Sequence, residues 1–183
     1  STSALELEEV PERLLVVGGG YIGLEMGTVY SSLGSQVSVV EITGDLLTGV
    51  DRDLVRPLFA RLQSQFHNIY LNTKLVSCEL KNNEIAVQFE GEVKTSSYDR
   101  ILVAVGRKPN TVDIGLEFTG VKTDGHGFIQ VDARFQTDES SIFAIGDVIG
   151  GVMLAHKASA EGKDVVGVLA GDEPSHKART IPA

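Results

Sequence analysis

The amino-acid sequence predicts an α/β fold: a parallel β-sheet with an inserted antiparallel meander, followed by a partial second α/β segment. Three observations predict this fold class. Continuous apolar runs, typical of strands covered on both faces, alternate with helical periodicity over residues 13–71. Apolar and polar residues then alternate with a period of two over residues 73–99. A further strand and helix pattern follows residue 116.

The first five predicted elements form a βαβαβ unit. The apolar run 13–17 ends at glycines, as a buried strand that enters a tight turn does. The next segment carries Ile22, Met26 and Leu33 at helical spacing and ends at Gly34, a suitable residue for a helix C-terminus. The predicted elements are a strand at 13–17, a helix at 21–34, a strand at 36–41, a helix at 51–66 and a strand at 68–71.

A three-stranded antiparallel meander is predicted next. Its strands are expected at 73–80, 83–90 and 92–99, joined at Lys81-Asn82-Asn83 and at Gly91-Glu92. The apolar run 101–106 then returns to the parallel sheet. Because the meander takes the place of the usual third crossover helix, the pattern favours a doubly wound sheet.

The composition shifts toward glycine and aspartate after residue 110, and we place a domain boundary near residue 115. Two short apolar segments, 127–132 and 142–147, predict strands. Residues 153–170 predict a last helix. These elements make up the partial second α/β segment.

Composition excludes several classes of protein. A chain of 183 residues can hold one complete core or one and a half domains. The formal net charge of -9, with basic residues scattered, argues against a nucleic-acid partner. No apolar run approaches the ~20 residues that cross a bilayer, and no signal peptide precedes the first strand, so we expect no membrane partner and a cytoplasmic location. Cys78 is the only cysteine and the four histidines are scattered, so we predict neither a disulfide nor a metal site.

The turn after the first strand has the glycine spacing GxGxxG at Gly18, Gly20 and Gly23. In a strand-turn-helix context this spacing indicates a Rossmann-like dinucleotide site, in which the backbone amides at the helix N-terminus bind a pyrophosphate. The structural alternative is a glycine turn that binds nothing. The candidate residues of the turn are Gly18, Gly19, Gly20, Tyr21, Ile22 and Gly23.

Glu41 ends the second predicted strand, 21 residues after Gly20. An acidic side chain at this place accepts hydrogen bonds from the adenosine ribose hydroxyls. No Arg or Lys follows at 42–44 to bind a 2′-phosphate, so NAD is favoured over NADP. The alternative is an ordinary surface carboxylate.

Three further residues are weaker candidates. Glu25 lies in the first turns of the predicted helix, where the helix dipole stabilises a carboxylate whether or not a ligand binds. Gly106 and Arg107 follow the closing strand at the carboxyl edge of the sheet, where open α/β sheets bind ligands. A plain strand-ending turn is the alternative for this pair.

Asp147 is the candidate of the second segment. It follows an apolar strand pattern and Gly146, so its carboxylate would accept hydrogen bonds from polyol hydroxyls near the N-terminus of the last helix. The alternative is a helix cap without a ligand.

Five ordered motifs resemble the glutathione-reductase-like pyridine nucleotide-disulfide oxidoreductases, and most closely their dihydrolipoamide dehydrogenase branch. The resemblance covers essentially the whole chain. The motifs are VVGGGYIGLEMG at 16–27, VSVVE at 37–41, VAVGRKPN at 103–110, IFAIGDV at 142–148 and MLAHKA at 153–158.

The resemblance implies a domain order. Residues 1–115 correspond to the NAD-binding domain, residues 116–178 to the returning segment of the FAD-binding domain, and residues 179–183 to the start of a dimerisation domain. The family's flavin GxGxxG, its CxxxxC redox disulfide and its His/Glu acid-base pair are expected outside residues 1–183. Both ends of the chain therefore resemble cuts at domain borders.

The resemblance also implies residue roles. Leu75 would contact adenine through its main chain, and Glu25, Gly106 and Arg107 would lie near the nicotinamide half of NAD. Asp147 would bind the ribityl chain of FAD, and Ala155 would approach the flavin through its backbone.

The function implied by the resemblance is that of a flavoprotein that oxidises dihydrolipoamide to lipoamide with NAD+. The chain alone, which has no catalytic residues of that reaction, is expected to bind NAD(H) without turnover. The longer protein would use NAD and FAD, act on lipoyl-bearing subunits and form a homodimer. Two alternatives stay open: a related flavin disulfide reductase with another substrate, and a nucleotide-binding module that does not catalyse.

Overall fold

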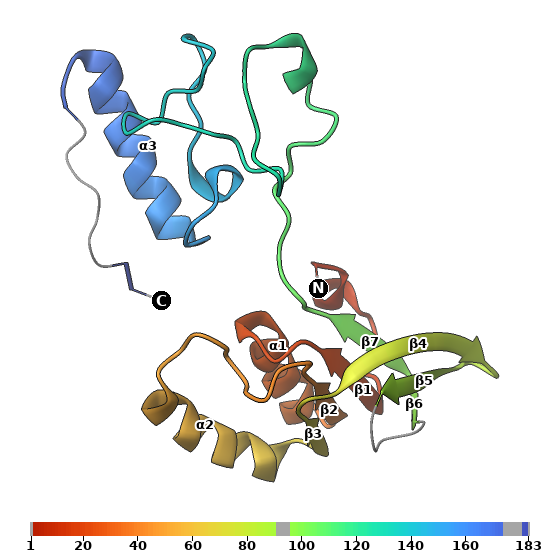
Figure 1. Ribbon diagram of the computed structural model, residues 1–183. Helices are drawn as coiled ribbons and strands as arrows, with labels where there is room; N and C mark the ends of the chain where they lie inside the picture. The colour runs from red at the N-terminus through yellow and green to blue at the C-terminus, as the bar shows by residue number, and fades with distance from the viewer. Residues whose placement is uncertain (1, 91–95, 174–180, 183) are drawn as a thin grey trace. The chain divides into compact units, whose positions relative to one another are not determined.

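The computed structural model describes residues 2–90, 96–173 and 181–182. The chain divides into two compact units, Ser1–Gly106 and Arg107–Ala183, and each is described by itself. The predicted α/β fold class is confirmed: the first unit combines a parallel sheet with a separate antiparallel sheet (Figure 1).

The first unit follows the predicted order of elements. Its four-stranded parallel sheet has the order β3-β2-β1-β7, and its antiparallel sheet has the order β4-β5-β6. The elements are the 3-10 helix η1 (Thr2–Glu6), β1 (Arg13–Val17), α1 (Tyr21–Ser32), β2 (Gln36–Val40), α2 (Arg52–Gln65), β3 (Asn68–Tyr70), β4 (Lys74–Lys81), β5 (Glu84–Glu90), β6 (Ser96–Tyr98) and β7 (Arg100–Val103).

The parallel sheet is covered on both faces, as its continuous apolar strands predict. Successive side chains of a strand point to opposite faces, so Leu14 and Val16 pack with helices α1 and α2. Leu15 of the same strand packs on the other side, with Val87 and Phe89 of the antiparallel sheet. The unit is therefore a three-layer arrangement of helices, parallel sheet and meander.

The meander has a tight first turn. Asn82 and Asn83 both have positive φ, 50° and 68°, which is the backbone of a type I′ hairpin turn and suits asparagine. The register Lys81↔Glu84 follows from this two-residue turn. The predicted connection at 91–92 lies outside the described residues.

One ion cluster joins β1 to the segment that precedes β7. The Asp99 carboxylate accepts hydrogen bonds from the Arg13 guanidinium and from the Arg13 backbone amide, both at 2.7 Å. The same guanidinium donates to Glu84 at 2.9 Å. The Arg13 hydrogen bond is the main cause that lowers the pKa of Asp99, against an opposing effect of burial.

We expect this cluster to make the stability of the first unit sensitive to acid. A carboxyl whose pKa is lowered by folding contributes stability above its unfolded value of 3.8, and this contribution is lost as pH falls through the folded pKa. Asp99→Asn should lower the free energy of unfolding by about 1 kcal/mol at neutral pH and by less at about pH 3. Urea unfolding at the two pH values measures this. Asp138→Asn, which removes an exposed ion pair with Lys122, is the matched control; an equal pH response in both variants would contradict the assignment.

The second unit contains the 3-10 helices η2 (Leu116–Phe118) and η3 (Gly146–Ile149) and the helix α3 (Ala155–Ala170). The predicted helix at 153–170 is confirmed with a later start. The predicted strands at 127–132 and 142–147 are wrong, because within the described residues these segments form only isolated bridges, Thr123↔Ile129 and Gln136↔Phe143.

Side-chain turns at Asp124 and Asp132 use backbone amides in and next to the first of these segments. The Asp124 carboxylate accepts hydrogen bonds from the amides of His126 and Phe128, and the Asp132 carboxylate accepts them from Arg134 and Gln136. Such local bonds compete with a strand ladder for the same backbone groups.

The two units meet in sequence nine residues before the boundary predicted at 115, because β7 already ends at Val103. The domain identities of 1–115 and 116–178 remain predictions. Of the predicted segment 179–183, only residues 181–182 are described.

Candidate functional site

The glycine turn joins the carboxyl end of β1 to the start of α1. Gly18 has φ +108°, a conformation that residues with a Cβ rarely adopt, and its amide donates to the Val40 carbonyl at 2.9 Å. A Cβ at this position would also lie less than 3.0 Å from the Ala104 carbonyl. Gly18 therefore places the turn between the ends of β1, β2 and β7.

The N-terminus of α1 is open. Gly20 is its N-cap residue. Among the described residues, no side chain caps it and no atom would lie within 4 Å of a Cβ on Gly20. The first amides of a helix have no intrahelical partner and carry the positive end of its dipole. This end of α1 can accept an anionic group close to the backbone.

The Glu41 carboxylate lies at the same turn. Its Oε2 accepts a hydrogen bond from the Gly19 amide at 2.7 Å, and its Oε1 accepts from the amide and the hydroxyl of Thr43, both at 2.9 Å. Burial raises the pKa of the Glu41 carboxyl, but the hydrogen bonds from Thr43, Gly19 and Ile42 outweigh it, so the net pKa lies below its usual value. Glu41 is therefore ionised at neutral pH.

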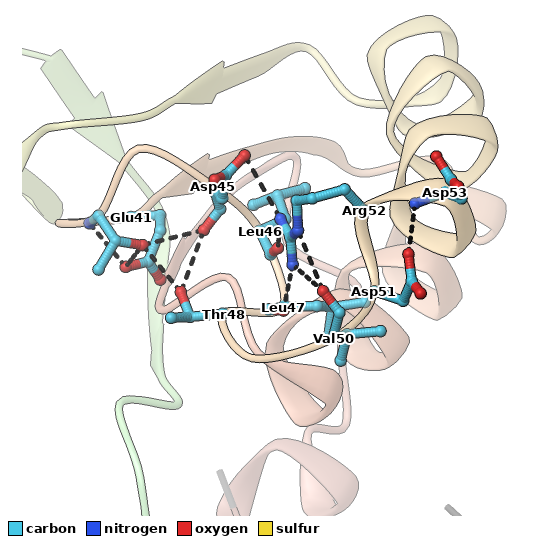
Figure 2. A network of polar contacts seen from close by, with 10 residues as sticks. Glu41, Asp45, Leu46, Leu47, Thr48, Val50, Asp51, Arg52 and Asp53 are labelled. Atoms are coloured by element: carbon cyan, nitrogen blue, oxygen red, sulfur yellow. Dashed lines mark hydrogen bonds and ion pairs between the residues drawn. The ribbon is translucent and has the colours of Figure 1, made fainter.

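The loop between β2 and α2 packs against the turn. The Leu47 amide donates to the Gly19 carbonyl at 2.9 Å, and a Cβ on Gly19 would lie 2.5 Å from the Leu46 side chain. Arg52, at the start of α2, donates to carbonyls of this loop, and Figure 2 shows it beside Leu46 and Val50.

The other candidates of the first unit lie on neighbouring elements. Tyr21 and Glu25 are exposed on α1, and Ile22 is half-buried. Leu75 is on β4 at a bulge, two residues after Thr73, whose amide donates to the Glu41 carbonyl at 2.9 Å. Gly106 follows β7 by three residues, and a Cβ there would meet no atom within 4 Å.

The second unit contains the three remaining candidates. Arg107 forms an ion pair with Asp147 at 2.8 Å, and both side chains are about half exposed. Ala155 is the first residue of α3, and no side chain in the described part of the chain caps that helix. Asp147 lies in η3, in the turn that precedes α3.

Helix α3 stabilises the turn that carries Asp147. The Glu161 carboxylate accepts a hydrogen bond from the Gly146 amide at 2.7 Å and forms an ion pair with Lys157, also at 2.7 Å. The side chains of Lys157 and Glu161 are only 13% exposed, so burial keeps this pair in one arrangement. These two residues were not predicted from the sequence.

The described ranges contain neither a candidate metal cluster nor a candidate membrane span. No group of three His, Cys, Asp or Glu side chains there could hold a metal ion. In the same ranges, no helix combines the length and apolar character that a membrane span requires.

The glycine turn with its acidic neighbour fits the result of a comparison with protein families. A model described as Pyridine nucleotide-disulphide oxidoreductase matches residues 1–162. The chain belongs to this family. The resemblance predicted from the five sequence motifs is thus confirmed.

Several family members are similar over the whole chain. A dihydrolipoyl dehydrogenase of Vibrio parahaemolyticus is 45% identical and one of Geobacillus stearothermophilus is 41% identical, each over 100% of this chain. The chain spans 39% of the length of each of these relatives.

Two solved structures share the fold. The Cu(II) complex of RclA, an HOCl-induced flavoprotein disulfide reductase from Escherichia coli, is 30% identical with a TM-score of 0.88 over 97% of this chain and 40% of RclA. LpdA from Mycobacterium tuberculosis is 27% identical, also with a TM-score of 0.88, over 97% of this chain and 39% of LpdA. Members of the pyridine nucleotide-disulphide oxidoreductase family use FAD and NAD(H), the two predicted cofactors.

Proposed function

We propose that the first unit binds NAD(H), as part of a longer flavoprotein oxidoreductase of this family. The observation that carries the proposal is the placement of an ionised carboxylate, Glu41, beside the open N-terminus of α1 at Gly20. A dinucleotide needs both features, because its pyrophosphate is anionic and its ribose hydroxyls are donors.

The geometry supports NAD rather than NADP. A carboxylate has about four lone-pair positions, so Glu41 can keep its bonds to Gly19 and Thr43 and still accept from a ribose hydroxyl. A 2′-phosphate would bring a second negative charge to the same carboxylate, and residues 42–44 contain no Arg or Lys to offset it. Leu75 and Gly106 would lie along the adenine and nicotinamide halves, with Glu25 and Arg107 in the supporting roles that the resemblance implies.

The second unit would contribute to the flavin site of the longer protein. Asp147 is a half-exposed carboxylate beside the uncapped N-terminus of α3 at Ala155, which suits a polyol chain and a partly anionic ring. When bound, FAD supplies two-electron transfer between a disulfide and NAD. The residues of this chain would hold the ribityl hydroxyls at Asp147 and position the ring against the backbone at Ala155.

For the longer protein we infer oxidation of dihydrolipoamide to lipoamide with NAD+. The relatives that are 41% to 45% identical over the whole chain are named dihydrolipoyl dehydrogenase, which supports this substrate. Lipoyl-bearing subunits as partners, a homodimer and a cytoplasmic location belong to the same proposal. The 183-residue chain alone should bind NAD(H) without turnover.

A second candidate is a flavoprotein disulfide reductase that acts on another substrate. The similarity to RclA favours it, because the TM-score of 0.88 covers 97% of this chain. Assaying the longer protein with dihydrolipoamide and with other dithiols distinguishes the two candidates.

The binding proposal is tested with Glu41→Gln. Loss of the negative charge should weaken NADH binding by about tenfold, because hydrogen bonds to a charged acceptor contribute ~1.5 kcal/mol or more. Affinity for NADPH should fall less or rise, since the repulsion of its 2′-phosphate is removed. Titration of NADH and NADPH fluorescence with the 183-residue chain measures both affinities.

The control is Glu117→Gln, an exposed carboxylate on η2 of the second unit. It should leave both affinities unchanged. Equal NADH affinity in the wild type and in Glu41→Gln would remove Glu41 from the site, and absence of NADH binding by the wild type would refute the proposed function itself.

A further inference from the structure

Arg52 occupies a position that helix formation does not explain. It is the first residue of α2, directly after the N-cap Asp51. A cation at the N-terminus of a helix faces the positive end of the dipole and is disfavoured there. Its place must therefore be stabilised by other contacts.

Those contacts are the carbonyls of the loop that precedes α2. The guanidinium donates to Leu46 at 3.1 Å, to Leu47 at 2.7 Å and to Val50 at 2.6 and 3.0 Å. It also lies 3.3 Å from the Asp45 carboxylate. Figure 2 shows the side chain directed back onto the loop, so that one planar group joins three separate peptide carbonyls.

The loop held in this way is strained at Leu47. Its φ is +50°, in the left-handed region that residues other than glycine, asparagine and aspartate rarely adopt. Leu47 is nevertheless 8% exposed, its neighbour Leu46 is 1% exposed, and both belong to the core beneath α1 and α2. A strained, buried segment persists only where surrounding contacts fix it, and the Arg52 bonds to both carbonyls are such contacts.

The same loop touches both parts of the dinucleotide site. Leu47 donates to the Gly19 carbonyl at 2.9 Å, on the glycine turn. At the other end of the loop, the Thr43 hydroxyl donates to Glu41 and lies 3.1 Å from the Thr48 hydroxyl. A shift of the loop would therefore move Gly19 and Glu41 together.

We propose that Arg52 is a positioning residue for the NAD(H) site, because it fixes the loop at 42–51 that supports Gly19 and Glu41. The inference rests on the proposed function of the first unit. Arg52 need not touch the dinucleotide: it acts through Leu46 and Leu47.

The proposal requires an arginine and not only a positive charge. A guanidinium presents five donors in a rigid plane, and Arg52 uses Nε, Nη1 and Nη2. A lysine ammonium has three donors on one nitrogen of a flexible chain, so it cannot reproduce this planar set of bonds. Arg52→Lys therefore separates geometry from charge. Arg56→Ala is the matched control, because Arg56 lies one turn further along α2 and forms an ion pair with the exposed Asp53.

The experiment uses the 183-residue chain as wild type, Arg52→Lys, Arg52→Ala and Arg56→Ala. Hydrogen exchange of the Gly19 and Leu47 amides, read by NMR without nucleotide, should accelerate by about tenfold in both Arg52 variants. The dissociation constant for NADH should rise by about three- to tenfold in the same two variants. Arg56→Ala should change neither, and thermal unfolding checks that each variant is folded.

The outcomes separate the two proposals. Unchanged exchange in Arg52→Lys, or faster exchange with unchanged NADH affinity, would overturn the positioning role of Arg52. If both Arg52 variants exchange faster but the wild type binds no NADH, the loop is fixed by Arg52 as inferred and it is the proposed NAD(H) function that fails.

Discussion

Gly23→Ala is expected to destabilise the first unit by about 3 kcal/mol, because the new methyl group has no room. A Cβ on Gly23 would lie less than 3.0 Å from the Gly18 carbonyl oxygen and 3.1 Å from the Val16 side chain. The oxygen belongs to the backbone of the glycine turn, so it cannot move away as a flexible side chain would. Either α1 must leave β1 or the turn must deform.

The intrinsic preference of alanine for helices opposes this effect only in part. Alanine is favoured over glycine inside a helix by about 1 kcal/mol, which is less than the cost of a backbone overlap. Gly27→Ala on the same helix is the matched control, since its Cβ would approach the end of the Phe66 ring at 3.1 Å, and a ring can shift. We expect Gly27→Ala to change stability by less than about 1 kcal/mol.

Thermal and urea unfolding followed by circular dichroism measure both variants. Gly23→Ala should lower Tm by roughly 10 °C or more, given the size of the first unit. A Gly23→Ala protein as stable as Gly27→Ala would mean that α1 does not sit this close to β1.

The sequence predicted the first unit well because its signals are local. Buried parallel strands are continuous apolar runs, and β1 and β2 were placed within one residue at each end. Glycine and asparagine at positive φ mark the ends of elements, as at Gly34 after α1 and at Asn82 in the meander. These features depend on neighbours along the chain, so a single sequence reveals them.

The second unit was predicted less well because strands need partners as well as a pattern. Residues 127–132 and 142–147 have the apolar residues of strands, but a ladder forms only where another backbone supplies its donors and acceptors. In this unit the Asp124 carboxylate binds the Phe128 amide of the first segment, and the Asp132 carboxylate binds the amide of Gln136, the bridge partner of Phe143. A pattern of apolar residues does not record that competition.

The residues of the candidate site also differ in how well the sequence predicts them. Gly18, Gly20 and Glu41 are candidates because their spacing belongs to a known arrangement, and the structure brings Glu41 within 2.7 Å of the Gly19 amide. Arg52 was not predicted because its proposed role depends on the fold of a loop with no regular structure. One signal was available: a cation directly after an N-cap aspartate is out of place for the helix alone.

Both units have the same hydrogen bond next to their candidate sites, from a glycine amide to a carboxylate. In the first, the Glu41 carboxylate accepts from the Gly19 amide at 2.7 Å, and in the second, the Glu161 carboxylate accepts from the Gly146 amide, also at 2.7 Å. Each bond fixes a glycine turn next to a helix N-terminus with a charged acceptor, which gives a shorter and stronger bond than a neutral one. Each turn is therefore stabilised by a charged acceptor of the protein itself.

Gly20→Ala is expected to have the opposite pattern from Gly23→Ala: little effect on stability and a large effect on binding. The backbone of Gly20, with φ -83° and ψ 179°, is open to any residue, and a Cβ there would meet no protein atom within 4 Å. Replacing an N-cap glycine by alanine should therefore change the free energy of unfolding by no more than about 1 kcal/mol.

The space next to Gly20 is where the pyrophosphate of a dinucleotide would approach the α1 amides, so a methyl group there should weaken NADH binding by at least about tenfold. Gly125→Ala is the matched control, because a Cβ at Gly125 also meets nothing within 4 Å but lies in the second unit. Calorimetric titration of NADH into both variants tests this, with Tm recorded alongside. If both variants bind NADH equally, the N-terminus of α1 at Gly20 is not the pyrophosphate site, because a methyl group there should clash with a phosphate bound against the α1 amides.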